Sequence, residues 1–399
     1  MMYNERIYVW LQSCFHHAGT KAAAAIHHFG SVSKWVGAVE TDLRLSGLFT
    51  DRELFLLIKK DLSAADQVID RCFKLGIDIL TPENPRYPAL LRQIPNYPLV
   101  LYVRGDLSDF DENPAVAIVG TRNATPGGVA FVQTLAADLA KAGMQIVSGG
   151  ALGIDTAAHA GAVLAGGKTV MVAGCGLNMD YPKPNRALKQ LIAAHGAVIS
   201  EFPPDTQPNK FTFPIRNRII SGLSLGVIVA EAGEVSGSLI TASRALEQNR
   251  DVFAVKLEEN RSYYRGAKKL LDDGAIPVWT SADVLREYIH LFPHKLRLET
   301  QFPKREVNRK KPEAENKEKR AVKAVSSEPI PEEPETPVSD HARAILAAVN
   351  GENGLDEICE SAGLSAGEVN CGLTELEMAG LIIRETAQSK FTKHPALRS

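Results

Sequence analysis

The sequence of 399 residues lacks the features that mark membrane-spanning and exported proteins. No apolar run reaches the roughly 20 residues that a membrane helix needs, and the start of the chain has no basic segment followed by a long apolar one. The five cysteines are scattered and show no CxxC spacing, so we expect neither a disulfide framework nor a zinc site. These absences predict a cytoplasmic protein with reduced cysteines, no membrane insertion and no metal.

The sequence also has little excess charge of either sign. Its 45 lysines and arginines nearly balance 47 aspartates and glutamates, which gives a formal net charge of −2. A histone-like protein covered in basic charge is therefore excluded, and any site for nucleic acid has to be a local patch. The length predicts two or three compact domains.

The first 75 residues show helical patterns interrupted by glycine. Residues 22–29 form a good helical segment, Gly30 and Ser31 end it, and residues 33–39 begin another. We predict a small N-terminal helical domain over 1–75, of the SAM-like type. Such a domain could bind the DNA backbone or serve as a packing cap, and its sequence favours neither.

Residues 76–293 show a different period, in which short β-branched runs alternate with helical stretches. Continuous apolar runs of this kind are typical of parallel strands buried on both faces, so we predict an α/β fold with a Rossmann-like, mostly parallel sheet. The predicted strands are 115–119, 145–147, 169–172, 197–199, 226–229, 252–255 and 276–278. A proline-rich piece over 77–107 holds one strand, 99–103, and should extend the sheet at an edge.

A polar segment and a small third domain follow. The stretch 304–337 has almost no apolar residue and has a basic half before an acidic one, so we predict a flexible linker over 294–338. A winged-helix domain over 339–399 is predicted from three helices and a strand, at 339–349, 356–361, 365–378 and 381–386.

The first candidate site is the run IVGTR at the end of the first central strand. Ligands bind beyond the carboxyl ends of parallel strands, where turns expose N–H groups and helix N-termini carry partial positive charge. Gly120 permits close approach of the backbone, and Arg122 offers a forked donor for phosphate. The run does not continue to GxGxxG, so no dinucleotide or other cofactor is predicted. The alternative is a tight turn at Gly120 and a surface ion pair at Arg122.

A second glycine-rich turn, SGGALGID, follows the next predicted strand. Ser148, Gly149 and Gly150 could form an anion-binding nest at a helix start, but a plain glycine turn with Asp155 as the helix cap explains them equally. Asp155 and His159 lie one helical turn apart and could be drawn as an acid–base pair. Nothing in the sequence supplies the further partner that a catalytic base needs, so no catalytic residue is predicted.

The third run, KFTFPIRNRIISG, interleaves cations with aromatic residues. Lys210, Arg216 and Arg218 could contact phosphates while Phe211 and Phe213 stack on bases, and such stacking is indifferent to base identity. In the alternative interpretation the rings are core residues and the arginines bridge to nearby carboxylates, Glu201 or Glu231.

The fourth run, EAGEVSGSLIT, follows the strand 226–229 and opens a helix. Ser236, Gly237 and Ser238 therefore offer one more helix N-terminus, although a serine there can simply cap the helix. All four runs follow strand ends in one parallel sheet, so they should meet at one edge. This convergence predicts the site better than any single run does.

Together these runs resemble the DNA-processing protein A (Smf) family. The resemblance covers about residues 5–290 and is most specific within 115–250, where it rests on IVGTR, SGGALGIDTAAHAGA, GCGLNMDYPKPN, SEFPP, FPIRNRIISGLS and EAGEVSGSLITASRALEQNR. It implies a protein without enzymatic activity that binds and protects single-stranded DNA during natural transformation, loads the RecA recombinase for homologous recombination and works as a homodimer.

The resemblance also implies roles for particular residues. Gly120, Thr121 and Arg122 look like the family's phosphate-binding turn, and Lys210 and Phe213 look like its lysine and its base-stacking aromatic. The RNR portion of the family motif is matched by Arg216 and Arg218, which could contact DNA or stabilise the fold.

Two other classes of function remain open. A nucleotide phosphoribohydrolase similar to the lysine-decarboxylase-like family would seat a nucleotide phosphate in the same glycine turns and use Glu231 as acid or base. The PGGxGTxxE signature of that family is replaced here by EAGEVSGSLIT. A scaffold protein would recruit partners through its linker and tail. Single-stranded DNA binding is the leading interpretation.

Two segments depart from the family's pattern. The sequence KLEEN at 256–260 stands where the family usually has Pro-Gly and a short loop, so the DNA side or the dimer side of the sheet can differ there. The predicted helix 365–378 carries Glu368, Glu375 and Glu377 and no lysine or arginine, and this excess of negative charge would repel a duplex. We therefore predict that the winged helix binds protein or excludes DNA, and duplex binding is the alternative.

Accordingly, the tail 339–399 on its own should show no measurable affinity for duplex DNA at physiological salt. Fluorescence anisotropy with a labelled duplex checks this, and binding of labelled single-stranded DNA by the full chain is the positive control. Duplex binding by the tail would contradict the prediction.

Overall fold

The computed structural model describes two compact units, Met1–Arg305 and Glu306–Ser399. In the first unit the described residues are 2–15, 19–256 and 264–297, and in the second they are 340–349, 353–364, 369, 373, 376, 382–385 and 390–393. No helix among these residues is long and apolar enough to cross a membrane.

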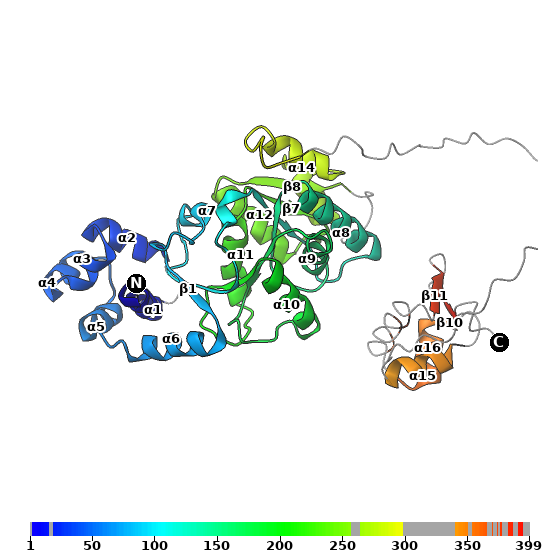
Figure 1. Ribbon diagram of the computed structural model, residues 1–399, viewed down its shortest axis with the longest axis horizontal. Coiled ribbons are helices and arrows are strands. Elements are labelled where there is room, and N and C mark those ends of the chain that lie inside the picture. The colour runs from blue at the N-terminus through cyan, green and yellow to red at the C-terminus, as the bar shows by residue number, and fades with distance from the viewer. Residues whose placement is uncertain are drawn as a thin grey trace, which may run out of the picture. The chain divides into compact units, whose positions relative to one another are not determined.

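Six helices open the first unit: α1 (Met2–Phe15), α2 (Gly19–Phe29), α3 (Val32–Gly37), α4 (Glu40–Leu45), α5 (Asp51–Lys59) and α6 (Ser63–Leu75). Trp35 lies fully buried at their centre and stacks on Phe49, with ring centroids 5.7 Å apart. Gly76 ends α6 in the left-handed conformation that favours glycine. The core of these helices continues into the sheet through Tyr102, so the helical group packs against one side of the sheet (Figure 1).

The sheet has nine strands in the described residues: β1 (Asp78–Leu80), β2 (Leu101–Gly105), β3 (Ala115–Val119), β4 (Gln145–Ser148), β5 (Thr169–Ala173), β6 (Ala197–Ser200), β7 (Gly226–Val229), β8 (Asp251–Val255) and β9 (Ile276–Val278). Their order is β1-β2-β6-β5-β4-β3-β7-β8-β9. The strands from β6 to β9 in this order are parallel, and β2 and β1 add antiparallel strands at one edge.

This sheet confirms the predicted fold class. All seven strands predicted between 115 and 278 are present, with ends that shift by at most one residue. The proline-rich piece does extend the sheet at an edge, and it contributes the short strand β1 as well as β2.

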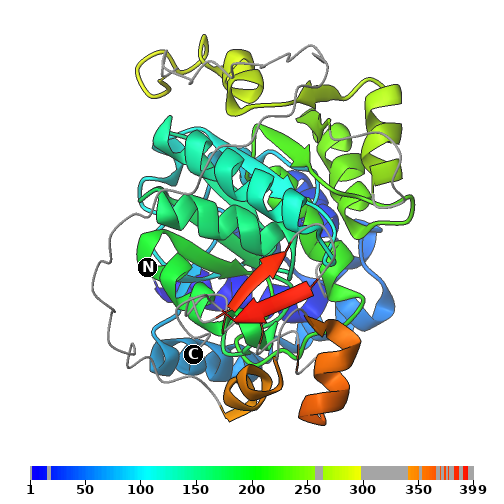
Figure 2. The same cartoon turned by 90° about the vertical axis from the view of Figure 1, so that its right-hand side faces the viewer.

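Helices cover both faces of the sheet because alternate residues of each strand point to opposite sides. On one face α8 (Pro126–Lys141), α9 (Ile154–Leu164) and α14 (Ser281–Tyr288) pack against Val116 and Ile118, with α10 (Arg186–His195) beside α9. Figure 2 shows α8 and α9 side by side. On the other face α7 (Ala89–Arg92), α11 (Thr212–Gly222) and α12 (Gly237–Glu247) pack against Ala117 and Val119. Helix α13 (Arg265–Asp272) lies beside β8, and the short helices η1 (Phe110–Glu112) and η2 (Lys183–Asn185) precede β3 and α10.

Strand β3 marks the point at which the strand order reverses. The chain runs from β3 outward through β4, β5 and β6, then returns to the other side of β3 as β7 and continues to β8 and β9. Loops that leave β3 and its two neighbours therefore run in opposite directions. A crevice at the carboxyl end of β3 is the expected consequence.

The second unit contains α15 (Asp340–Ala348), α16 (Leu355–Ala362) and an antiparallel sheet of β10 (Asn353–Gly354), β12 (Lys390–Lys393) and β11 (Ile382–Glu385). Its core includes Ile345, Ile358 and Leu373. Of the predicted helix 365–378 only positions 369, 373 and 376 are described, so its three glutamates lie outside the described residues. Most of the predicted linker, from 298 on, and the segment 257–260 lie outside them as well.

Candidate nucleic-acid interface

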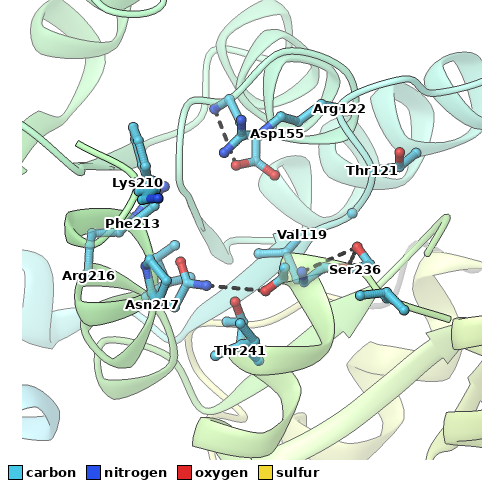
Figure 3. Close-up of a pocket in the computed structure, with 18 of the residues that line it drawn as sticks. Val119, Thr121, Arg122, Asp155, Lys210, Phe213, Arg216, Asn217, Ser236 and Thr241 are labelled. Carbon is cyan, nitrogen blue, oxygen red and sulfur yellow. Dashed lines mark hydrogen bonds between the residues drawn. The ribbon is translucent and has the colours of Figure 1, made fainter. Parts of the chain in front are cut away.

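A cavity of about 700 Å³ opens at the carboxyl end of β3, where the strand order reverses (Figure 3). We call it the main cavity. Its walls are the turn after β3, the start of α11 with the residues before it, and the loop from β7 into α12. Figure 3 shows Arg122 and Asp155 on one side of this space and Lys210, Phe213 and Arg216 on another.

Most of the predicted site residues meet here. The main cavity is lined by Gly120, Thr121, Arg122, Lys210, Phe213, Arg216, Ser236, Gly237 and Ser238. Gly149 lines a smaller side pocket that shares Arg122 and Phe213 with the main cavity. Ser148 is fully buried and donates its hydroxyl to Ile118 O at 2.6 Å, and Arg218 lines a separate pocket. The structure thus brings all four sequence runs to one edge but turns Ser148 and Arg218 away from the main cavity.

Two exposed cations, Arg122 and Lys210, line the main cavity together with the Phe213 ring. The Arg122 guanidinium carbon lies 5.5 Å from the centre of the Phe213 ring, and Lys210 enters from the segment before α11. Within the described residues neither cation has a carboxylate within 4 Å. Their charge therefore remains available to an anionic ligand.

Tyr181 is a lining residue that sequence reasoning missed. Its ring centre lies 5.5 Å from that of Phe213 at an interplanar angle of 36°, and it is 37% exposed. The signal was present, because an aromatic residue in GCGLNMDYPKPN follows the end of β5 in the same way as the other runs follow their strands. Asn217 and Thr241 also line the cavity and were not predicted.

Glu231, directly after β7, holds the turn after β3 in place. Its main-chain oxygen accepts a hydrogen bond from Thr121 N at 2.7 Å. Its fully buried carboxylate accepts bonds from the backbone N–H (2.8 Å) and the hydroxyl of Thr125, the residue that caps α8. A Cβ at Gly120 would lie 2.9 Å from the Glu231 main-chain oxygen, so only glycine fits this close approach. The N-terminus of α8 is thus neutralised by an internal anion.

Asp155 plays a comparable role in the second glycine turn. Its carboxylate is buried at the first turn of α9 and accepts a bond from Ala151 N at 3.3 Å. Burial raises the pKa of Asp155, and the nearby Arg216 opposes that rise. Both groups fit beneath the turn because Gly149 has no side chain there. Asp155, rather than an external ligand, occupies this turn.

The two arginines of the RNR sequence face different surroundings. Arg218 is buried and donates two bonds to the Glu201 carboxylate, the closer at 2.5 Å, and a third to Asn96 O. Arg216 is 5% exposed, forms part of the wall of the main cavity and donates to Val172 O, while its Nε has no partner among the described atoms. Burial lowers the pKa of Arg216 to about 10, so it stays charged at neutral pH. Arg218 therefore stabilises the fold, and Arg216 adds positive charge to the cavity.

His159 does not face the main cavity. It is fully buried, and its Nδ1 lies 2.8 Å from the Thr169 hydroxyl. Burial, with a smaller contribution from Arg216, lowers the pKa of His159 to about 3, so the ring is neutral. Asp155 lines the main cavity but His159 does not, so the two cannot act together as an acid–base pair on a ligand there.

Comparisons with known proteins identify the family of this chain. A family model for the DNA recombination-mediator protein A matches residues 78–289, more than half of the chain, and a model for the DprA winged helix domain matches 310–388. The chain belongs to the DNA recombination-mediator protein A family. Its C-terminal unit accordingly contains the winged-helix domain of that family.

Several relatives of this family are similar over much of the chain. Protein Smf of Synechocystis is 38% identical over 77% of this chain and 78% of its own length. The DNA processing protein DprA of Streptococcus pneumoniae is 40% identical over 60% of this chain and 88% of its own. A crystal structure of the S. pneumoniae protein superimposes with a TM-score of 0.64 at 35% identity and covers 71% of this chain and 97% of its own.

The buried His159 predicts a pH dependence of stability. Between pH 6.5 and pH 5 the unfolded chain takes up a proton at this ring and the folded chain does not, so the free energy of unfolding should fall by about 2 kcal/mol. Urea denaturation across this range measures it. The variant His159→Gln should be less stable at pH 7, but its free energy of unfolding should no longer show the part of the pH dependence that comes from His159. An unchanged pH dependence would contradict the assignment of His159 as a buried neutral ring.

Proposed function

We propose that this chain binds single-stranded DNA in the main cavity during natural transformation and acts as a recombination mediator. One observation carries the proposal: Arg122, Lys210 and the Phe213 ring line one cavity, and among the described residues neither cation has a carboxylate within 4 Å. Cations of this kind bind backbone phosphates, and an accessible ring stacks on a base. Membership of the DNA recombination-mediator protein A family supports the same conclusion.

The arrangement favours a single strand over a duplex. A base can stack on Phe213 only where it is not already enclosed in a base-paired stack. Among the described residues, the main cavity is lined by the cations Arg122, Lys210 and Arg216 and by one carboxylate, that of Asp155, which accepts a hydrogen bond from Ala151 N. Because the net charge of the chain is near neutral, any site for nucleic acid has to be a local basic patch, and this cavity is such a patch.

We also propose that binding, rather than catalysis, is the activity. The hydrolase interpretation needs Glu231 as acid or base, but its carboxylate is fully buried, is bonded to Thr125 and does not line the main cavity. His159 is buried and neutral. These placements support a site that holds its ligand without reacting with it.

Three further proposals rest on family membership alone. We propose that the protein protects the bound strand, loads RecA onto it and acts as a homodimer.

The proposed domains are a helical domain over 1–75, an extended Rossmann-like DNA-binding domain over 76–293, a linker over 294–338 and the winged helix over 339–399. The proposed DNA-binding residues are the nine that line the main cavity, with Gly149 at its side pocket. Tyr181 joins them because it packs on Phe213.

The salt dependence of binding tests the proposal. With about three to four phosphate contacts, the logarithm of the affinity for single-stranded DNA should fall with the logarithm of salt concentration with a slope of roughly −2 to −3. Lys210→Ala should reduce the magnitude of this slope by about 0.7 and weaken homopolymers and mixed sequences alike. Fluorescence anisotropy measures both quantities. A slope near zero, or a loss confined to one sequence, would count against phosphate binding with sequence-independent stacking.

The aromatic ring has a matched control in the same segment. Phe213→Ala should weaken binding by about 1–3 kcal/mol. Phe211→Ala removes an exposed ring two positions away that does not line the main cavity and whose contact is with Lys210, at 5.1 Å from its centre, so its effect should be smaller than that of Phe213→Ala. Equal losses in the two variants would contradict stacking at Phe213.

A further inference from the structure

A second group of cations lies on the far side of the loop 174–185. A pocket of about 240 Å³, which we call the outer pocket, is lined by Arg104, Asn178, Asp180, Arg186, Lys189, Gln190 and Ala193. It lies between β2, α10 and the loop that follows β5. Asn178 and Asp180 belong to the run GCGLNMDYPKPN, and the proposed function involves none of the residues that line the outer pocket.

Two of these cations are held close together without a carboxylate between them. Arg104 Nη1 donates to Leu177 O at 3.3 Å, and Lys189 Nζ donates to the same oxygen at 2.9 Å and to Met179 O at 2.7 Å. A neutral carbonyl does not offset the repulsion between two positive charges. Burial lowers the pKa of Lys189, and the charge of Arg104 adds to this effect. An anion bound beside the pair would relieve the repulsion.

The remaining charges of the pocket leave it positive. Arg186 Nε lies 3.4 Å from the Asp180 carboxylate, and both side chains are largely exposed. Arg104 has no carboxylate within 4 Å in the part of the chain that the structure describes. No aromatic residue lines the pocket, so a nucleic acid would be bound by its phosphates and not by its bases.

One loop separates the outer pocket from the main cavity. Tyr181 lines the main cavity, whereas its neighbour Asp180 lines the outer pocket. Consecutive Cα atoms are about 3.8 Å apart, so the two sites lie on either side of one short piece of chain. The exposed Lys183 follows on the same loop, between Tyr181 and Arg186.

We propose that a DNA strand bound in the main cavity continues across this loop, and that the outer pocket holds phosphates of the nucleotides next along the strand. This inference rests on the proposed function. It assigns Arg104 and Arg186 as direct phosphate contacts and Lys189 as the charge behind them. A short oligonucleotide should therefore fill the main cavity alone, and a longer one should reach both sites.

The double variant Arg104→Gln/Arg186→Gln of the full chain tests this proposal with oligonucleotides of about 5 and about 20 nucleotides. The long one should bind about tenfold more weakly, with a salt slope reduced in magnitude by about 1.4 for two lost phosphates, and the short one should be unaffected. Arg186→Gln alone should give part of the loss, which keeps the test decisive if the double variant is unstable. Arg286→Gln is the matched control, because Arg286 is 69% exposed and lies 3.4 Å from Asp283.

The outcomes separate this proposal from the proposed function. Equal affinity of wild type and double variant for the long oligonucleotide, while Lys210→Ala weakens both lengths, would overturn the outer pocket alone. Failure of the wild type to bind either length would overturn both. If inorganic phosphate raises the melting temperature of the wild type but not of the variant, and DNA affinity is unchanged, the pocket binds free phosphate and the proposed strand path is wrong.

Discussion

The buried carboxylate of Glu231 is the constraint on which the rest of the site depends. It stands at the end of β7, beside the point where the strand order reverses, and bonds Thr125 at the N-terminus of α8. Its main-chain oxygen accepts a hydrogen bond from Thr121 N, so Glu231 links the ends of β3 and β7 to the N-terminus of α8. A buried carboxylate is stable only when its oxygens are paired, and here backbone N–H, hydroxyl and helix dipole supply that pairing. The orientation of Arg122 follows from the turn that this network holds.

The same network distinguishes this sheet from dinucleotide-binding sheets. In dinucleotide-binding sheets the N-terminus of the first helix receives a phosphate. Here Glu231 occupies that position at α8, and Asp155 fills the glycine turn before α9. In the proposed function, phosphates would instead contact the side chains of Arg122 and Lys210 and the N-terminus of α12, whose Ser236 and Ser238 line the main cavity. Cationic side chains at the carboxyl edge of the sheet suit a polymer that extends beyond the main cavity, rather than a nucleotide that is enclosed for a reaction.

The fold was predictable because the strands are buried on both faces, which makes them continuous apolar runs, and because the helices between them are long enough for crossovers. The convergence of the site followed from one geometric rule about strand ends. What could not be predicted depends on contacts between distant residues. The pairing of Arg218 with Glu201 joins α11 to the end of β6, and nothing in the RNR sequence separates that arginine from Arg216. Ser148 was predicted to line the site and is buried, whereas Tyr181 was not predicted and lines it, because side-chain direction depends on tertiary packing.

The central claim is that the main cavity holds an unpaired strand by charge and stacking. Its most direct test is one titration series of wild type and Arg122→Ala with single-stranded DNA, duplex DNA and a mononucleotide. The wild type should prefer the single strand over both other ligands by at least about tenfold, a difference of about 1.4 kcal/mol. Arg122→Ala should remove most of that preference. A mononucleotide that binds as tightly as the single strand, and that releases its free base, would contradict the account and indicate a nucleotide hydrolase instead.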